Sequence, residues 1–254
     1  MDRALFLGMN GAKQTMQAMK VSANNLANVS TTAFRADLAQ ARAMPAYGNG
    51  VPSRVFSMTE RSGQNFSKGS MVTTGYDLDI MIQGNGWISV IDESGHEGLT
   101  RNGNFIINQD GLLTNSSGHL VLGDSDAPIA LPIPVSKVEI SNDGSISVIL
   151  KGAPANSIET INRIKLVNLN QESLFKDFNG LLRLKERERG NEISMYQSDE
   201  SVKLLSGSLE GSNVNAIEEM TNLIALQRQF ETQIKIMSTA EDMDKASDLL
   251  FHTN

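Results

Sequence analysis

Residues 1–28 place apolar side chains at intervals that alternate between four and three positions. This spacing puts them on one stripe of an α-helix, as in helices that pack along their whole length. The pattern stops near Asn28, where β-branched and capping residues follow, and the first proline is Pro45. The sequence therefore predicts an N-terminal helix with one apolar seam, made of Leu5, Met9, Ala12, Met16, Met19, Ala23 and Leu26.

Residues 210–254 repeat this design. Asn215 followed three residues later by Glu218 is typical of a helix N-terminus, and it predicts a helix from near Ala216 to about Leu250. The alternation by four and three continues along it, with one polar interruption at Gln227. The predicted C-terminal seam is Ala216, Met220, Leu223, Gln227, Phe230, Ile234 and Met237.

The two seams are expected to pack against each other, because most helix stability comes from burial of an apolar face. Residues 1–40 hold four basic and two acidic residues, a net charge of +2. Residues 210–254 hold three basic and eight acidic residues, a net charge of −5. Opposite charge favours pairing of the two helices, although exposed ion pairs give only ~0–1 kcal/mol each.

The middle of the chain has a different pattern. Residues 41–72 are rich in Gly and Pro, which predicts a linker or an irregular extended arm. From about Tyr76 the apolar positions alternate with period two, and Asn-Gly, Asp-Gly and Ser-Gly pairs recur between short apolar runs. Such a pattern indicates an antiparallel, all-β domain. The expected class is α+β, with a discontinuous, coiled-coil-like helical domain (1–40 and 207–254), a linker (41–72) and an inserted β domain (73–206).

Composition narrows the possible partners and the compartment. The net charge of −7 and the lack of a cluster of Lys and Arg argue against nucleic acid. Cysteine is absent, which favours the interpretation that the chain is an exported bacterial protein. The first apolar residues are interrupted too early for a cleavable signal peptide, and no apolar run approaches the ~20 residues of a membrane span.

The search for catalytic chemistry returns little. His96, His119 and His252 lie far apart without metal-ligand spacing, and no nucleophile or phosphate-binding motif occurs. Asp77 and Asp79 share one face of a predicted strand and are the one carboxylate pair that could act as acid and base, but a solvated strand face is the favoured interpretation. We expect no catalytic residue, no cofactor and no metal.

Four stretches, in order along the chain, resemble the bacterial flagellar rod and hook proteins. They are residues 23–28 with 32–35, residues 78–87, residues 100–105 with 110–114, and residues 207–215 with 218–220. Ala33 stands where that family usually has glycine. One such stretch alone would be weak, but four in sequence are specific. The first three residues, the length and residues 24–37 look most like the proximal-rod member, with a distal-rod or hook-type subunit as the alternative.

The resemblance implies a structural subunit of the periplasmic rod that passes rotation from motor to hook. It implies partners among proximal and distal rod proteins and copies of the chain itself, export by the flagellar type III apparatus without a cleaved signal, and no enzyme activity. The alternative from another class is a secreted β-rich glycan-binding or hydrolytic protein, which would need an aromatic platform or a paired acid site.

Subunit assembly is expected to use the two helices. Asn24, Asn25 and Asn28 either donate hydrogen bonds between helices or only end the first helix. The candidate assembly residues are Leu5, Met9, Ala12, Met16, Met19, Ala23, Asn24, Asn25, Leu26, Asn28, Met220, Leu223, Phe230, Ile234 and Met237.

Overall fold

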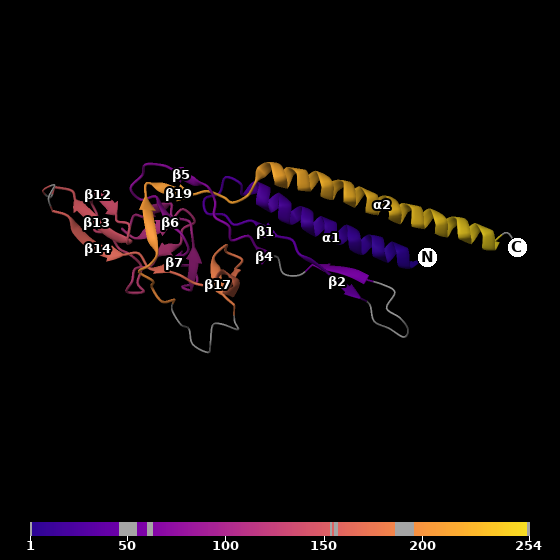
Figure 1. The fold of residues 1–254 in the computed structure, drawn as a ribbon, viewed down its shortest axis with the longest axis horizontal. Coiled ribbons are helices and arrows are strands. Elements are labelled where there is room, and N and C mark those ends of the chain that lie inside the picture. Colours follow the sequence, from indigo (N-terminus) through magenta and orange to yellow (C-terminus); the bar gives the residue numbers. More distant parts are fainter. Residues whose placement is uncertain are drawn as a thin grey trace. The chain divides into compact units, whose positions relative to one another are not determined.

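The chain folds into two compact units, and each unit is built from separate stretches of sequence (Figure 1). The computed structural model describes residues 2–45, 55–59, 63–152, 154, 157–185 and 196–252. The helical unit contains Met1–Val29, Arg35–Asn65 and Val214–Asn254, and the β unit contains Ser30–Phe34 and Phe66–Asn213. The predicted α+β class is confirmed, whereas the coiled-coil character of the helices stays a prediction.

Two long helices, α1 (Asp2–Ala27) and α2 (Ala216–His252), run side by side in opposite directions in the helical unit (Figure 1). The Asn215 side chain accepts a hydrogen bond from the Ile217 N–H at 3.1 Å, which caps α2 where the sequence predicted its start. At the other helix, the Asn28 side chain donates to the Asn24 carbonyl at 2.8 Å and so satisfies an acceptor in the last turn of α1.

The predicted linker over residues 41–72 is more regular than expected. β2 (Ala41–Pro45) pairs antiparallel with β3 (Val55–Thr59), and β1 (Asp37–Leu38) pairs with β4 (Gly63–Gln64). Half of the Gly and Pro residues that suggested an irregular arm, Gly48, Gly50 and Pro52, fall in residues 46–54, outside the described residues. On either side of residues 46–54, β2 and β3 form a two-stranded ladder, in which the N–H and carbonyl groups of one strand hydrogen-bond to those of the other.

The largest sheet of the β unit is antiparallel, as predicted. Its strand order is β16-β17-β8-β7-β11-β10-β9, and β15 also pairs with β7. The strands are β7 (Trp87–Ile91), β8 (Glu97–Thr100), β9 (Phe105–Ile107), β10 (Leu113–Asn115), β11 (Leu120–Val121), β15 (Leu166–Val167), β16 (Leu174–Lys176) and β17 (Leu182–Leu184). A 3-10 turn, η1 (Gln171–Ser173), precedes β16.

The other strands of the β unit form one three-stranded sheet and two strand pairs. The order β12-β13-β14 makes the sheet, β18 pairs with β6, and β19 pairs with β5. The strands are β5 (Met71–Thr73), β6 (Ile80–Gln83), β12 (Val135–Ile140), β13 (Ser145–Leu150), β14 (Glu159–Arg163), β18 (Lys203–Ser206) and β19 (Ser208–Glu210).

Several predicted turns close these ladders. The glycines of the pairs at 110–111, 117–118 and 143–144 all have positive φ and connect paired strands. Gly103 is different, since it lies between β8 and β9, which are not paired with each other. A Cβ at Gly103 would lie 2.0 Å from the Ile80 carbonyl oxygen, so close backbone approach requires glycine there.

The core of the β unit consists of branched aliphatic side chains. One cluster includes Ile80, Ile88, Leu113 and Ile146, and a smaller one surrounds the fully packed Trp87. Side chains alternate between core and solvent along β13, as a half-buried antiparallel strand requires.

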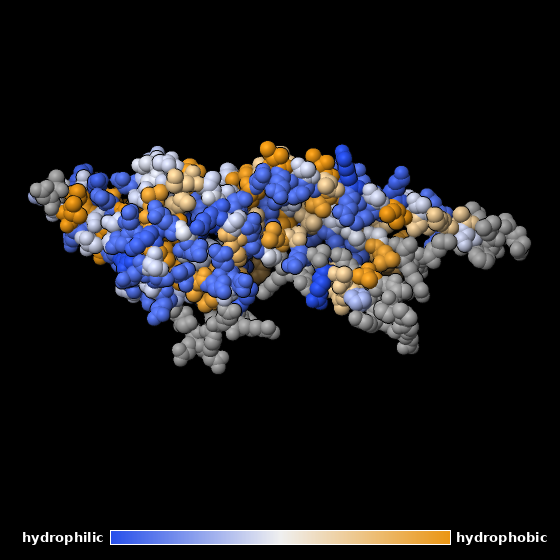
Figure 2. Space-filling view, viewed as in Figure 1, coloured by the Kyte–Doolittle hydropathy of each residue, from blue (hydrophilic) through white to orange (hydrophobic). Residues whose placement is uncertain are grey.

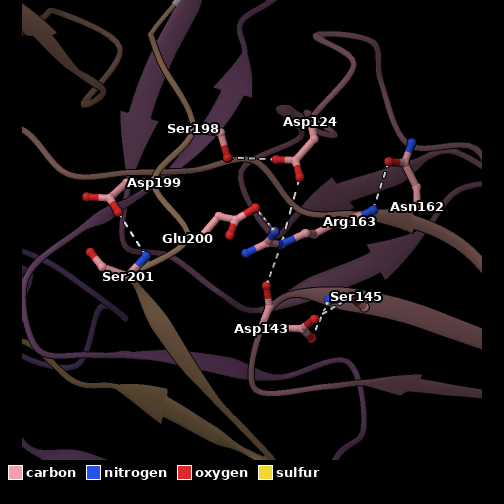
Figure 3. Close-up of polar contacts among 9 residues, drawn as sticks. All are labelled: Asp124, Asp143, Ser145, Asn162, Arg163, Ser198, Asp199, Glu200 and Ser201. Carbon is pink, nitrogen blue, oxygen red and sulfur yellow. Dashed lines mark hydrogen bonds and ion pairs between the residues drawn. The ribbon is translucent and has the colours of Figure 1, made fainter.

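Polar contacts centred on Arg163 join three loops of the β unit (Figure 3). Its Nε donates to the Asp143 carbonyl at 2.8 Å, and its guanidinium pairs with Asp124 at 3.8 Å and Glu200 at 3.3 Å. Asp124 in turn accepts from the Ser198 hydroxyl at 2.8 Å. These bonds fix loop ends, and they account for the acidic residues gathered there without a ligand.

Candidate assembly surface

The face of α1 that packs on α2 is made of small and polar residues. A Cβ added at Gly8 would lie 2.7 Å from Met237 Cγ, and one added at Gly11 would lie 2.9 Å from Gln233 Nε2. Thr15 and Ser22 continue this stripe towards the end of α1, and both are buried. Small residues at spacings of three and four let the two helix axes approach closely, because no long side chain stands between them.

Polar side chains connect the two helices along this stripe. The Thr15 hydroxyl lies 3.1 Å from Gln233 Oε1. Asn25, which is almost fully buried, donates to Glu219 Oε1 at 2.7 Å and to the Asp37 carbonyl at 2.9 Å, while its own Oδ1 accepts from the Asp37 N–H at 2.9 Å. Asn25 therefore joins α1, α2 and β1.

Two of the three asparagines of the N-terminal motif take the two roles that the sequence left open. Asn25 donates between helices, as described above. Asn28 bonds back to the Asn24 carbonyl within α1 and so helps to end the helix. The Asn24 side chain is exposed.

The predicted seam of α1 forms only part of the contact with α2. Met9 is 51% exposed and Met16 is 48% exposed, and Leu5 and Ala23 are also exposed. The other predicted residues of this seam, Ala12 (buried) and Met19 and Leu26 (half-buried), are more covered. The expectation that the two seams pair with each other is therefore only partly correct for α1, since helices that approach closely need small residues between them.

The predicted seam of α2 is half correct. Leu223, Phe230 and Met237 are half-buried on the stripe towards α1, whereas Met220 and Ile234 point away from it and are exposed. The inner stripe is completed by Leu226 and Gln233, three residues after Leu223 and Phe230 rather than four. Helical spacings of three and four are both compatible with one face, so the apolar pattern alone could not choose between them.

Six of the large apolar side chains that the two helices leave exposed form what we call the apolar band, whereas others, including Phe6, Leu7, Ile236 and Met243, are exposed elsewhere on the helices. It consists of Met9 and Met16 on α1 and of Ile217, Met220, Ile224 and Ile234 on α2. Ile217 is 77% exposed and Met220 is 54% exposed. Figure 2 shows hydrophobic groups gathered over the first turns of α2. Ile217 and Ile224 were missed in the sequence, although their spacing of seven residues is a signal that could have identified them.

Parts of the four sequence stretches singled out above, from residues 32–34, 78–87, 100–114 and 207–213, lie in the β unit and contact one another there. Arg101 Nη1 pairs with Glu210 Oε2 at 2.9 Å, and these side chains are 3% and 0% exposed. The Ala33 N–H donates to the Glu210 carbonyl at 2.7 Å, and Ala33 itself has φ +58°, so alanine adopts the left-handed turn that glycine would take more easily. The Asn104 amide donates to the Asp79 carboxylate at 2.9 Å. These bonds therefore fix the contacts between segments of the β unit that are distant in sequence.

The tryptophan and the carboxylate pair that a hydrolase or glycan-binding site would need do not form an open site in the β unit. Trp87 is buried, with Phe66 packed edge-on at 6.0 Å between ring centroids and the Arg101 guanidinium 5.2 Å from its ring. Asp79 is buried against Asn104, so it does not share an open face with Asp77. Among the described residues, no group of His, Asp and Glu could hold a metal ion.

Two buried charge clusters in the β unit are paired. Lys165 lies 2.7 Å from Glu97 and also contacts Asp126. Burial acts to raise the pKa of Asp92, but hydrogen bonds from the His96 backbone and from Arg183 and Ser94 outweigh it, so the net pKa lies below its usual value. His119 is half-buried, and burial lowers its pKa. The His252 side chain lies outside the described residues. These charges serve folding, because each faces a partner.

Comparison with known proteins places the chain in a family. Three family models match in order: "Flagella basal body rod protein" over residues 6–35, "Flagellar hook protein FlgE/F/G D1 domain" over residues 81–148, and "Flagellar basal body rod FlgEFG protein C-terminal" over residues 205–248. The flagellar basal-body rod protein FlgF of Escherichia coli is 38% identical over 98% of this chain and 99% of that protein. The chain belongs to the flagellar basal-body rod protein family.

Further relatives refine this placement. FlgF of Salmonella typhimurium is 36% identical over 98% of the chain, whereas the basal-body rod protein FlgG of Agrobacterium fabrum is 27% identical over 95%. Matches to FlgF proteins over nearly the full length support a structural subunit of the proximal rod, as the sequence predicted. The first and last matched segments fall on α1 and α2, which carry the apolar band. No described helix is long and apolar enough to cross a membrane.

Proposed function

We propose that this rod-family subunit polymerises through its two terminal helices and passes torque along the flagellar rod. The observation that carries the proposal is the apolar band. Met9, Met16, Ile217 and Met220 are each about half exposed or more on helices whose inner faces are already packed. Full burial of such a side chain stabilises by roughly 1.5–3 kcal/mol, so a neighbour that covered the band would gain substantial binding energy.

The position of the apolar band on a stiff pair of helices suits a subunit that transmits torque. Two antiparallel helices resist bending, and the hydrogen bonds of Asn25 to Glu219 and Asp37 resist sliding of α1 along α2. Torque applied to a neighbour through the band would therefore reach both helices together.

The partners that follow are copies of this chain and other proximal-rod and distal-rod proteins. The proposed location is the rod of the basal body in the periplasm, reached through the flagellar type III export apparatus without a cleaved signal. We propose no catalytic role, since Trp87 and Asp79 have structural contacts in the β unit.

The test is complementation of a strain that lacks the gene for this subunit. Met16→Glu places a charge in the apolar band, whereas Gln17→Glu places the same charge on the adjacent exposed position and serves as a matched control. We expect Met16→Glu to abolish swarming in soft agar and Gln17→Glu to preserve it, with equal amounts of both chains exported to the medium or periplasm. Equal swarming by the two variants would refute assembly through the band.

A further inference from the structure

The apolar band lies on one flank of the α1–α2 pair. Met9 follows Gly8, and Ile224 follows Leu223, so on each helix the band is one residue, or roughly 100°, beyond the stripe that faces the other helix. The helices are antiparallel and face each other. One step in the same sense therefore leads to the same flank on both helices, so the band residues of α1 and α2 share one flank. The exposed Gln227 and Glu231 lie between Ile224 and Ile234 on that flank.

The opposite flank carries a groove. It has a volume of about 310 Å³ and is lined by α1, α2 and β1, including Ala18, Val21, Leu38, Ala225 and Leu226. Val21 and Ala225 each lie one residue before a member of the inner stripe, Ser22 or Leu226, which places them on the flank away from the band. Half of the lining residues are small or aliphatic and can contact apolar side chains, and the other half, including Ser22, Asn222 and Gln229, are polar.

The α1 part of the band is basic, whereas the groove is acidic. Lys13 and Lys20 are exposed, and each lies four residues after Met9 or Met16, so they stand beside the band on α1. On α2, Arg228 borders both surfaces, and the exposed Glu231 lies on the stripe of Ile224.

The groove, in contrast, is acidic. Asp37 and Glu219 line it, and the exposed Glu218 lies seven residues before Ala225 on the same helix stripe. No Lys or Arg is among the described residues of its lining.

We propose that the apolar band of one copy docks into the groove of a second copy. This inference rests on the proposed function and specifies which surfaces meet. Band and groove are different patches, so the contact is heterologous: each bound copy still presents a free band or a free groove. A heterologous contact that does not close on itself generates a helical filament, which is the geometry that a rod needs. Opposite charge at the two patches selects this arrangement over band against band.

Disulfide trapping tests the contact directly, because the chain contains no cysteine of its own. Two differently tagged chains, Met16→Cys and Ala225→Cys, are produced together in the deletion strain, and isolated basal bodies are treated with a mild oxidant. A disulfide requires Cα atoms within about 7 Å, so only close surfaces react. We expect a product of two chains that carries both tags. Gln17→Cys with Ala225→Cys is the matched control and should give none.

Each other result would overturn docking between copies. A product that joins only Met16→Cys chains would show band against band, and a product of this chain with a different protein would show another occupant. No product in basal bodies that contain both tagged chains would show that the surfaces do not meet. These results leave the rod function intact, which fails instead if the tagged wild-type chain is absent from basal bodies.

A charge exchange supplies an independent measurement. Lys13→Glu with Lys20→Glu should reduce swarm expansion about tenfold, because like charges would then face each other across the contact. Adding Glu218→Lys to the same chain should restore swarming to within about twofold of wild type if one complementary pair is recovered. Circular dichroism of the purified chains controls for folding. Loss without restoration, or no loss at all, would contradict the proposed contact.

Discussion

Removal of one partner from the buried pair of Arg101 and Glu210 should strongly destabilise the β unit. Arg101 Nη1 lies 2.9 Å from Glu210 Oε2, and the same guanidinium donates to the carbonyls of Gly86 at 3.0 Å and Gly84 at 2.6 Å. Glu210 Oε1 accepts from the Gly69 N–H at 3.0 Å. The pair thus connects four segments of the chain, at Gly69, Gly84–Gly86, Arg101 and Glu210. We consider the variant Arg101→Met, which keeps a long unbranched side chain and removes the charge.

The expected loss is about 3–5 kcal/mol, since removal of one partner leaves a buried carboxylate without its counter-ion. The two backbone carbonyls also lose their donor, which explains why full compensation is not expected. The double variant Arg101→Met with Glu210→Met should recover roughly 0.5–3 kcal/mol of the loss, the usual range for residues in direct contact. Lys137→Met is the matched control, because its 3.5 Å pair with Glu139 is exposed and contributes at most about 1 kcal/mol.

Urea unfolding followed by tryptophan fluorescence measures these changes. Trp87 is the only tryptophan of the chain and lies beneath the Arg101 guanidinium, so its emission reports unfolding of the β unit. With a slope of about 2 kcal/mol/M, Arg101→Met should lower the urea midpoint by about 2 M, whereas Lys137→Met should lower it by less than about 0.5 M. Equal midpoints for the two variants would show that the buried pair is not a main source of stability.

Further variants test other parts of the structure. Asp92→Asn should destabilise the chain at neutral pH but not at low pH. The pKa of Asp92 is lower in the folded chain than its unfolded-state value of about 3.9, so the ionised carboxylate stabilises the fold above that pH, and this stabilisation is lost as pH falls through the folded-state pKa. Chemical unfolding at several pH values measures the effect. Ala33→Gly should raise thermal stability by about 1 kcal/mol, since glycine adopts a positive φ without strain, and an unchanged or lower melting temperature would contradict this reasoning. Gly11→Leu should weaken the α1–α2 pair by about 1–3 kcal/mol through overpacking against α2, seen as earlier loss of helical circular dichroism. Wild type and the Asp77→Asn, Asp79→Asn double variant should show equal, background release of sugar from peptidoglycan, and turnover lost only in the variant would reveal an enzyme.

The sequence predicted the class of the fold and the position of both helices, because those depend on local signals. The cap at Asn215 and the spacing of apolar residues are visible without tertiary structure. The glycine turns at 111, 118 and 144 were also visible, since positive φ selects glycine locally. The role of Gly103 was not, because it depends on the approach of the Ile80 carbonyl from a strand distant in sequence.

The assembly surface was predicted in part, and the misplaced residues have a common cause. A search for large apolar residues finds the positions with most surface to bury, and it therefore selected Met9 and Met16 as the inner seam. The inner seam uses Gly8, Gly11 and Thr15 instead. Hydropathy gives these residues little weight, although their own spacing of three and four is as regular as that of the methionines.

The small residues of α1 face α2 and the large apolar residues face solvent, and this arrangement determines when apolar surface is buried. Within one chain, the α1 stripe that faces α2 buries little apolar area, because glycine and threonine have little to bury, and hydrophobic stabilisation is roughly proportional to that area. The large side chains of Met9, Met16, Ile217 and Met220 are left to solvent in the single chain. Each fully covered one would add roughly 1.5–3 kcal/mol, so most of the apolar energy of the helices becomes available only when a neighbouring subunit covers the band. A chain arranged in this way can hold its helices in register by polar contacts such as Asn25 with Glu219 while it remains weakly stabilised until it polymerises.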